Sequence, residues 1–167
     1  LKGEASFFID MLLQKIRSDN IIVQKDEENS IADTIKSAVD SYPMGDNERK
    51  RIEINITDDF IYKGEKEIIM HVFYNLLKNA LYYTRKTDKI IISTEIDKDF
   101  KKVIFKDTGK GIDEEMLPHI FDQFFSKTKY GTGLGLNFCK IVLNQIGGDI
   151  TCKSKKGEFT EFTLFFS

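Results

Sequence analysis

The sequence has few of the features that mark several common functional classes. Its 25 lysines and arginines are balanced by 27 acidic residues, for a net charge of −2, so it lacks the basic excess typical of nucleic-acid binding. It contains no run of about 18 apolar residues, which argues against a membrane-spanning helix. Its first residues resemble no signal peptide and include no initiator Met. We therefore expect a piece of a longer protein.

The sequence also has few cysteines and lacks the P-loop motif. The two cysteines, Cys139 and Cys152, are far apart and form no C-x-x-C pair. This spacing argues against a disulfide scaffold or a zinc site and favours a reducing, cytoplasmic compartment, with both thiols in the core. The sequence G-x-x-x-x-G-K-[ST] is absent, which excludes P-loop chemistry.

The hydrophobic pattern predicts one α+β domain. A chain of 167 residues that is 41% hydrophobic can bury one core. Helical and strand periodicities alternate, which predicts a two-layer α/β sandwich whose mixed, mostly antiparallel sheet is covered on one face by helices. We expect helices at about 1–18, 31–40 (capped by Asn29 or Ser30), 65–84 and 134–146, a polar connection at 24–30, a helical turn near 113–117, and strands at about 51–57, 89–96, 102–106, 150–154 and 159–166.

The long helix predicted at 65–84 carries the first chemical signal. Its apolar side chains form one broad face, while His71, Asn75 and Asn79 recur every four residues on another face. Asparagine has mediocre helix propensity, so two in register call for a reason. They are either solvated surface residues or ligands for a hard cation such as Mg²⁺, which prefers oxygen. This helix alone leaves both interpretations open.

A strand that runs into Asp107-x-Gly109-x-Gly111 carries the second signal. The glycines allow the backbone to approach a ligand closely. The Asp107 carboxylate can accept a charge-assisted hydrogen bond from an amino group such as that of adenine. The alternative interpretation is a tight turn with a surface aspartate.

A second glycine cluster, residues 131–135, precedes the last predicted helix. Backbone N–H groups at a helix N-terminus bind anions. The cluster is no dinucleotide fingerprint, because Leu136 replaces the third glycine and no strand precedes it. Residues 121–130 lie between the two clusters, and their length and flanking glycines predict a mobile lid. Its Lys127 and Lys129 either reach phosphates or are solvated loop charges.

Together these segments resemble the catalytic domain of bacterial sensor histidine kinases, within the superfamily of gyrase and Hsp90. The order and spacing of all the motifs match over about residues 30–166. A finer similarity points to hybrid kinases of the quorum-sensing type. The matching segments are Asn75-Leu-Leu-Lys-Asn79-Ala (N box), Asp107-Thr-Gly-Lys-Gly111 (G1 box), Phe121-Asp-Gln-Phe-Phe125 (F box), Gly131-Thr-Gly-Leu-Gly135-Leu (G2 box) and Gly157 to Phe162 near the end.

The resemblance implies a site for ATP and Mg²⁺. Asn79 would ligate the metal with help from Asn75. Asp107 would bind the adenine amino group, and Thr160 would lie near the adenine and contact it through a water. The other residues expected to bind ATP are Tyr83, Gly109, Gly111, Ile112, Lys127, Lys129, Gly131, Thr132, Gly133, Leu134, Gly135 and Leu136.

Two departures from the family's pattern affect the expected phosphate contacts. Tyr82 stands where the family often has a lysine, three residues after the second asparagine, and Lys127 or Lys129 can replace it. Ser126 stands where many members have an arginine shortly after the F box.

The residue at position 75 favours phosphoryl transfer over hydrolysis. ATPases of the superfamily have a glutamate there that activates water, and a neutral amide cannot act as that base. In histidine kinases the nucleophile is a histidine on a helical dimerization domain, and neither His71 nor His119 has that setting. We expect residues 1–23 to be a remnant of that domain and residues 24–167 to be the catalytic domain.

The resemblance also implies partners. The parent protein would be a homodimer, anchored in the inner membrane with this domain in the cytoplasm, and would pass phosphate to a response-regulator receiver domain. No nucleic-acid partner is expected. Two other functions stay open: an ATP-dependent switch without transfer, and a serine kinase of the anti-sigma type, which shares the motifs.

Overall fold

The computed structural model describes residues 23–125 and 135–167. Short strands and helices alternate along the first half, and the last two strands form a hairpin. The elements are β1 (Glu28–Ser30), α2 (Ile31–Ser41), α3 (Asp46–Arg49), β2 (Ile52–Asn55), β3 (Ile61–Lys63), α4 (Lys66–Tyr83), β4 (Ile90–Ile96), β5 (Lys101–Asp107), the 3₁₀ helix η1 (Leu117–His119), α5 (Gly135–Gln145), β6 (Asp149–Lys155) and β7 (Phe159–Phe166).

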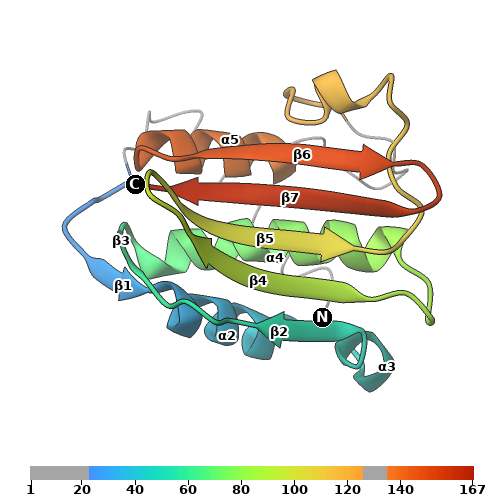
Figure 1. Ribbon diagram of the computed structural model, residues 1–167, viewed down its shortest axis with the longest axis horizontal. Helices are drawn as coiled ribbons and strands as arrows, with labels where there is room; N and C mark the ends of the chain where they lie inside the picture. Colours follow the sequence, from blue (N-terminus) through green and yellow to red (C-terminus); the bar gives the residue numbers. More distant parts are fainter. Residues whose placement is uncertain (1–22, 126–134) are drawn as a thin grey trace.

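The main sheet has five strands in the order β2-β4-β5-β7-β6 (Figure 1). Strand β2 runs parallel to β4, and the other three pairings are antiparallel. Strands β1 and β3 form a separate antiparallel pair. The predicted fold class, a mixed and mostly antiparallel sheet in an α+β sandwich, is confirmed.

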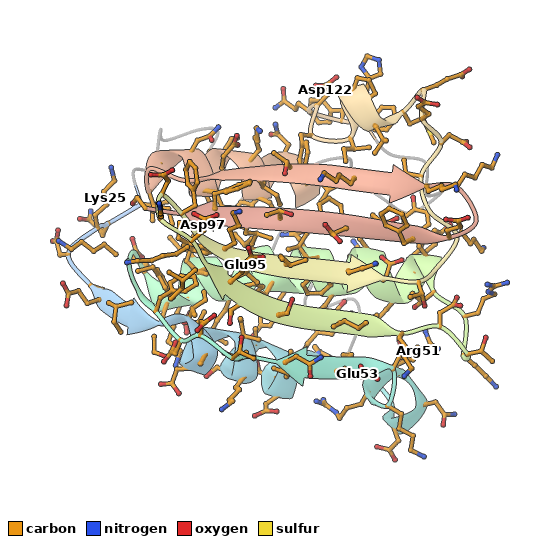
Figure 2. The ribbon with its side chains drawn as sticks, viewed as in Figure 1. Lys25, Arg51, Glu53, Glu95, Asp97 and Asp122 are labelled. Atoms are coloured by element: carbon orange, nitrogen blue, oxygen red, sulfur yellow. The ribbon has the colours of Figure 1, made fainter. Side chains whose placement is uncertain are left out.

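Three helices, α2, α4 and α5, cover one face of the sheet (Figure 1). Helix α4 lies in the middle and packs against both others. The core lies between these layers, where Ile92, Val103 and Leu164 are almost completely buried. The face of the sheet away from the helices carries charged side chains such as Glu53 and Glu95 (Figure 2). Within the described ranges, no helix has both the length and the apolar character needed to cross a membrane.

Local chemistry explains most of the helix boundaries. Ser30, one of the two caps that the sequence allowed, is the N-cap of α2, and its Oγ accepts a hydrogen bond from the Asp33 backbone N–H at 3.2 Å. Gly147 follows α5 in the left-handed region, with a φ of 84°. The helix predicted at residues 1–18 lies outside the described residues.

Several predicted elements were wrong in detail. The polar connection at 24–30 contains β1, and β3 and α3 were not predicted at all. The turn expected near 113–117 is present, with the Met116 N–H bonded to the Asp113 carbonyl oxygen at 2.9 Å, and it continues into the 3₁₀ helix at Leu117–His119. The missed elements have only three or four residues, too few to show a hydrophobic period.

Candidate functional site

The predicted base-binding residues meet at one end of the sheet. Asp107 is the last residue of β5, and Thr160 lies directly beside it in β7. Tyr83 is the last residue of α4, which ends at the same side of the molecule (the right-hand end in Figure 1). Facing residues on neighbouring antiparallel strands have their Cβ atoms about 5 Å apart. Asp107 and Thr160 therefore belong to one site.

Asp107 is a buried carboxyl group with one strong partner. Only 4% of its surface is exposed, and its Oδ1 accepts a hydrogen bond from the Gly109 N–H at 3.0 Å. Desolvation raises the pKa of Asp107 to about 6, the Gly109 bond opposes that rise, and the charge of Asp88 adds to it. Within the described residues no other hydrogen bond reaches this carboxylate. The surface-aspartate interpretation is therefore wrong.

Two glycines shape the turn after Asp107 by letting the chain approach itself. A Cβ on Gly109 would lie 2.3 Å from the Tyr83 carbonyl oxygen, which also accepts a bond from the Lys110 N–H at 3.1 Å. Gly111 has a φ of +70°, and a Cβ there would lie 2.3 Å from the Lys155 carbonyl oxygen. The turn is thus fixed between the end of α4 and the β6–β7 hairpin.

A serine that the sequence reasoning missed lies on the edge strand β6 at this end of the sheet. Ser154 faces Thr160 in the β6–β7 register, and their hydroxyl oxygens are 3.1 Å apart. The Ser154 hydroxyl also bonds the Ile112 N–H and the Phe159 carbonyl oxygen, each at 2.7 Å. The signal that could have found Ser154 is the alternation of β6, which puts it on the same face as buried Ile150.

The two asparagines of α4 occupy different environments. Asn75 is only 4% exposed, and its Nδ2 donates to the His71 carbonyl oxygen at 2.9 Å. A Cβ on Gly135, the first residue of α5, would lie 2.4 Å from the Asn75 Oδ1, so this amide fills the junction between the helices. The solvated-surface interpretation is therefore wrong for Asn75.

Asn79 lies one turn further along α4 and is half-buried. Within residues 23–125 and 135–167, no side chain or backbone group is hydrogen-bonded to its amide. The same ranges contain no group of three histidine, cysteine, aspartate or glutamate side chains that could hold a metal ion. An unengaged amide oxygen fits a metal whose other ligands come from phosphates.

The predicted phosphate-binding end is described only in part. Gly135 opens α5, and half-buried Leu136 packs against the core. The Asn137 Nδ2 donates to the Phe121 carbonyl oxygen at 3.0 Å, which ties this helix to the end of the segment that follows Gly111. The predictions for Lys127, Lys129, Gly131, Thr132, Gly133 and Leu134 lie outside the described residues.

A separate cleft of about 420 Å³ lies beside the start of β2. Arg51 reaches from it to the Thr84 hydroxyl oxygen at 3.2 Å. This basic cleft contains none of the predicted site residues. It is lined by Asn47, Lys50, Arg51, Lys86, Thr87, Asp88 and Lys89.

Known proteins are similar to this chain in sequence and in fold. Residues 64–167 match the family of histidine kinase-, DNA gyrase B-, and HSP90-like ATPases. The chain is 39% identical over 163 residues to the autoinducer 1 sensor kinase/phosphatase LuxN of Vibrio harveyi, which covers 95% of the chain and 19% of LuxN. It is 34% identical over 160 residues to the CAI-1 autoinducer sensor kinase/phosphatase CqsS of Vibrio cholerae, covering 95% of the chain and 23% of CqsS.

Solved structures show the same architecture. The nucleotide-free catalytic domain of the histidine kinase ThkA matches with a TM-score of 0.68 and 25% identity, over 84% of this chain and 96% of that one. Full-length ShkA in complex with AMPPNP matches with a TM-score of 0.74 and 19% identity, over 99% of this chain and 36% of ShkA. The chain spans about a fifth of the length of its curated relatives.

Proposed function

Because the chain belongs to the family of histidine kinase-, DNA gyrase B-, and HSP90-like ATPases, we propose that it is the ATP-binding catalytic domain of a sensor histidine kinase. Its task is to present the γ-phosphoryl group of ATP to a histidine on a dimerization domain. The observation that carries this proposal is the buried, singly bonded carboxylate of Asp107 beside Thr160.

The base end of the site fits adenine. The Asp107 carboxylate is an acceptor with a free oxygen, which matches the donor character of an amino group. Ile112 and half-buried Tyr83 add apolar surface beside it. Gly109 and Gly111 hold the turn in place through their close contacts with the chain. These residues bind and orient the purine.

The amide of Asn79 fits the metal that accompanies ATP. Mg²⁺, when bound with the nucleotide, neutralises charge on the phosphates during transfer. Asn75 supports this position indirectly, because it holds the junction of α4 and α5 through His71 and Gly135. Gly135 and Leu136 then place the first turn of α5 next to the asparagine helix, where N–H groups favour an anion.

The chemistry of Asn75 supports transfer over hydrolysis. A buried amide that donates to the His71 carbonyl has no capacity to take a proton from water. The acceptor histidine is therefore expected elsewhere. His71 is half-buried against Tyr74, and His119 is exposed in η1 beside Asp122, at 3.1 Å.

The domain and partner assignments follow from this function. We assign residues 24–167 to the catalytic domain and residues 1–23 to the end of the dimerization domain. The partners are that dimerization domain and a response-regulator receiver domain. We place the parent as a homodimer, anchored in the membrane, with this domain in the cytoplasm. The relatives that support this are named sensor kinase/phosphatases and are several times longer than this chain.

A titration and a transfer assay test the proposal together. We expect calorimetry to show ATP–Mg²⁺ binding at micromolar to sub-millimolar affinity, and labelled phosphate to pass from ATP to an added dimerization domain. Asn79→Ala should abolish this transfer. Asn144→Ala is the matched control, because Asn144 is an exposed helical asparagine on α5. Undiminished transfer by Asn79→Ala would refute the metal role.

A further inference from the structure

The Ser154 hydroxyl touches three groups at the base end of the site. They are the Phe159 carbonyl oxygen at 2.7 Å, the Ile112 N–H at 2.7 Å and the Thr160 hydroxyl at 3.1 Å. Ser154 is half-buried, and Thr160 is only 4% exposed. No part of the proposed function yet uses this serine.

Counting hydrogens fixes the direction of each bond. A hydroxyl group has one hydrogen to donate and two lone pairs that accept. The Phe159 carbonyl can only accept, so it receives the Ser154 hydrogen. The Ile112 N–H can only donate, so it takes one lone pair of Ser154. The remaining lone pair accepts the Thr160 hydrogen. Thr160 therefore turns its only hydrogen toward β6.

The fixed hydrogen leaves Thr160 with lone pairs alone to offer a ligand. Asp107, its neighbour in the β5–β7 register, is also an acceptor when ionised. We propose that Ser154 is a positioning residue that locks Thr160 as an acceptor, so that the site selects purine nucleotides with an amino group at the 6-position over those with an oxo group. This inference rests on the proposed ATP-binding function and names how that site chooses its base.

The selection follows from hydrogen-bond satisfaction. A 6-amino group donates directly to groups that accept. A 6-oxo group would face two acceptors and remain unpaired in a buried site, which is costly. A Thr160 hydroxyl that was free to rotate could donate to the oxo group and remove part of that penalty. The restraint on Thr160 is therefore what preserves the discrimination.

The test compares dissociation constants of ATP and ITP, which differ at the 6-position, for the wild type and Ser154→Ala. We expect the wild type to prefer ATP and Ser154→Ala to lose about 5- to 10-fold of that preference, the equivalent of one neutral hydrogen bond. Thr151→Ala is the matched control, because Thr151 is an exposed hydroxyl residue on the same strand and should leave the ratio unchanged.

A double-mutant cycle separates positioning from a general loosening of the fold. In a Thr160→Val background, Ser154→Ala should no longer change the ATP-to-ITP ratio. If Ser154 only holds the turn at Ile112, its loss weakens ATP and ITP equally, and the unchanged ratio overturns the inference. Ser154→Cys introduces a thiol of similar size that is a poor acceptor, and it should shift the ATP-to-ITP ratio in the same direction as Ser154→Ala. This variant replaces Ser154→Ala in the test if the alanine variant does not fold.

The outcomes distinguish the two proposals. If the wild type binds ATP and the ratio is the same in Ser154→Ala, the inference fails and the proposed function stands. If the wild type binds neither nucleotide, the proposed function fails, and the inference fails with it.

Discussion

Asp107 combines two properties that oppose each other. Its carboxylate is the group that a 6-amino purine would recognise, yet it is buried with a single hydrogen bond to Gly109. Burial raises its pKa to about 6 from the ordinary value of 3.8, so the charged form is destabilised in the free protein. As the proposed ligand of the purine, Asp107 should lower the stability of the free protein, because its environment suits the ligand rather than the empty fold.

The first prediction concerns stability in Asp107→Asn. Between pH 3.8 and about 6 the unfolded carboxyl has lost its proton while the folded one keeps it, so folding stability falls as pH rises through this window. The loss is complete above about pH 6 and amounts to roughly 2–3 kcal/mol at about 1.4 kcal/mol per pKa unit. Asp107→Asn, which removes the charge, should be more stable than the wild type near neutral pH by up to that amount.

Urea denaturation at neutral and acidic pH measures this difference. The advantage of Asp107→Asn should shrink as pH falls to about 4, where the native carboxyl is protonated. Asp99→Asn is the control, since Asp99 is exposed in the turn between β4 and β5. An Asp107→Asn variant that is less stable than the wild type at neutral pH would mean that the carboxylate is not desolvated.

The second prediction concerns binding by the same residue. Asp107→Asn should bind ATP about 10- to 100-fold more weakly, the equivalent of one charge-assisted hydrogen bond. Wild-type affinity should fall as pH drops through about 6, because binding requires the ionised carboxylate. Calorimetry of both proteins across this range isolates the effect, since protonation of ATP itself is common to both. Parallel pH profiles would contradict the assignment.

At the scale of elements, the junction of α4 with α5 holds the asparagines in place. The two helices come together where Gly135 meets the Asn75 amide, and a second contact joins the Cys139 thiol to the Val72 carbonyl. The third prediction is that Gly135→Ala destabilises the fold by about 1–3 kcal/mol, because its Cβ would lie 2.4 Å from the Asn75 Oδ1.

Chemical denaturation and the transfer assay measure the effect of Gly135→Ala. Transfer should fall together with stability, since the displaced Asn75 lies one turn from Asn79. Gly45→Ala is the control, because a Cβ there would meet nothing closer than 3.8 Å and the backbone is extended. Equal stability of the two variants would show that the helices separate easily.

Sequence patterns predicted the long elements well and the short ones poorly. Helix α4 and strands β4 and β7 were placed within about two residues, because each spans enough residues to show its period. Strands β1 and β3 exist only through their mutual pairing, from Glu28 with Lys63 to Ser30 with Ile61. That pairing connects distant parts of the chain and leaves no local signal.

The site was predictable as a set of motifs but not as a network. The motifs named Asp107 and Thr160 separately, and only the β5–β7 register shows that they face each other. Ser154 belongs to no motif used in the sequence reasoning, and its three hydrogen bonds depend on how β6, β7 and the turn at Ile112 come together. Spacing along the sequence carries no information on such contacts.

At the scale of the whole molecule, we propose that the chain supplies a nucleotide site and needs a partner domain for phosphoryl transfer. The fourth prediction is that residues 1–167 incubated with ATP and Mg²⁺ gain no acid-labile phosphate, and that label appears only on an added dimerization domain. Phosphate analysis by mass spectrometry after neutral and acidic work-up checks this. Acid-labile label on His71 or His119 would show that the chain phosphorylates itself.

The most direct test of the central claim is an amide chemical-shift map recorded by NMR during titration with ATP and Mg²⁺. The proposed purine site lies at the end of β5, so the largest changes should fall on Gly109, Ile112 and Thr160, with further changes around Asn79. Changes confined to the basic cleft around Arg51 and Lys86, or no changes at all, would contradict it.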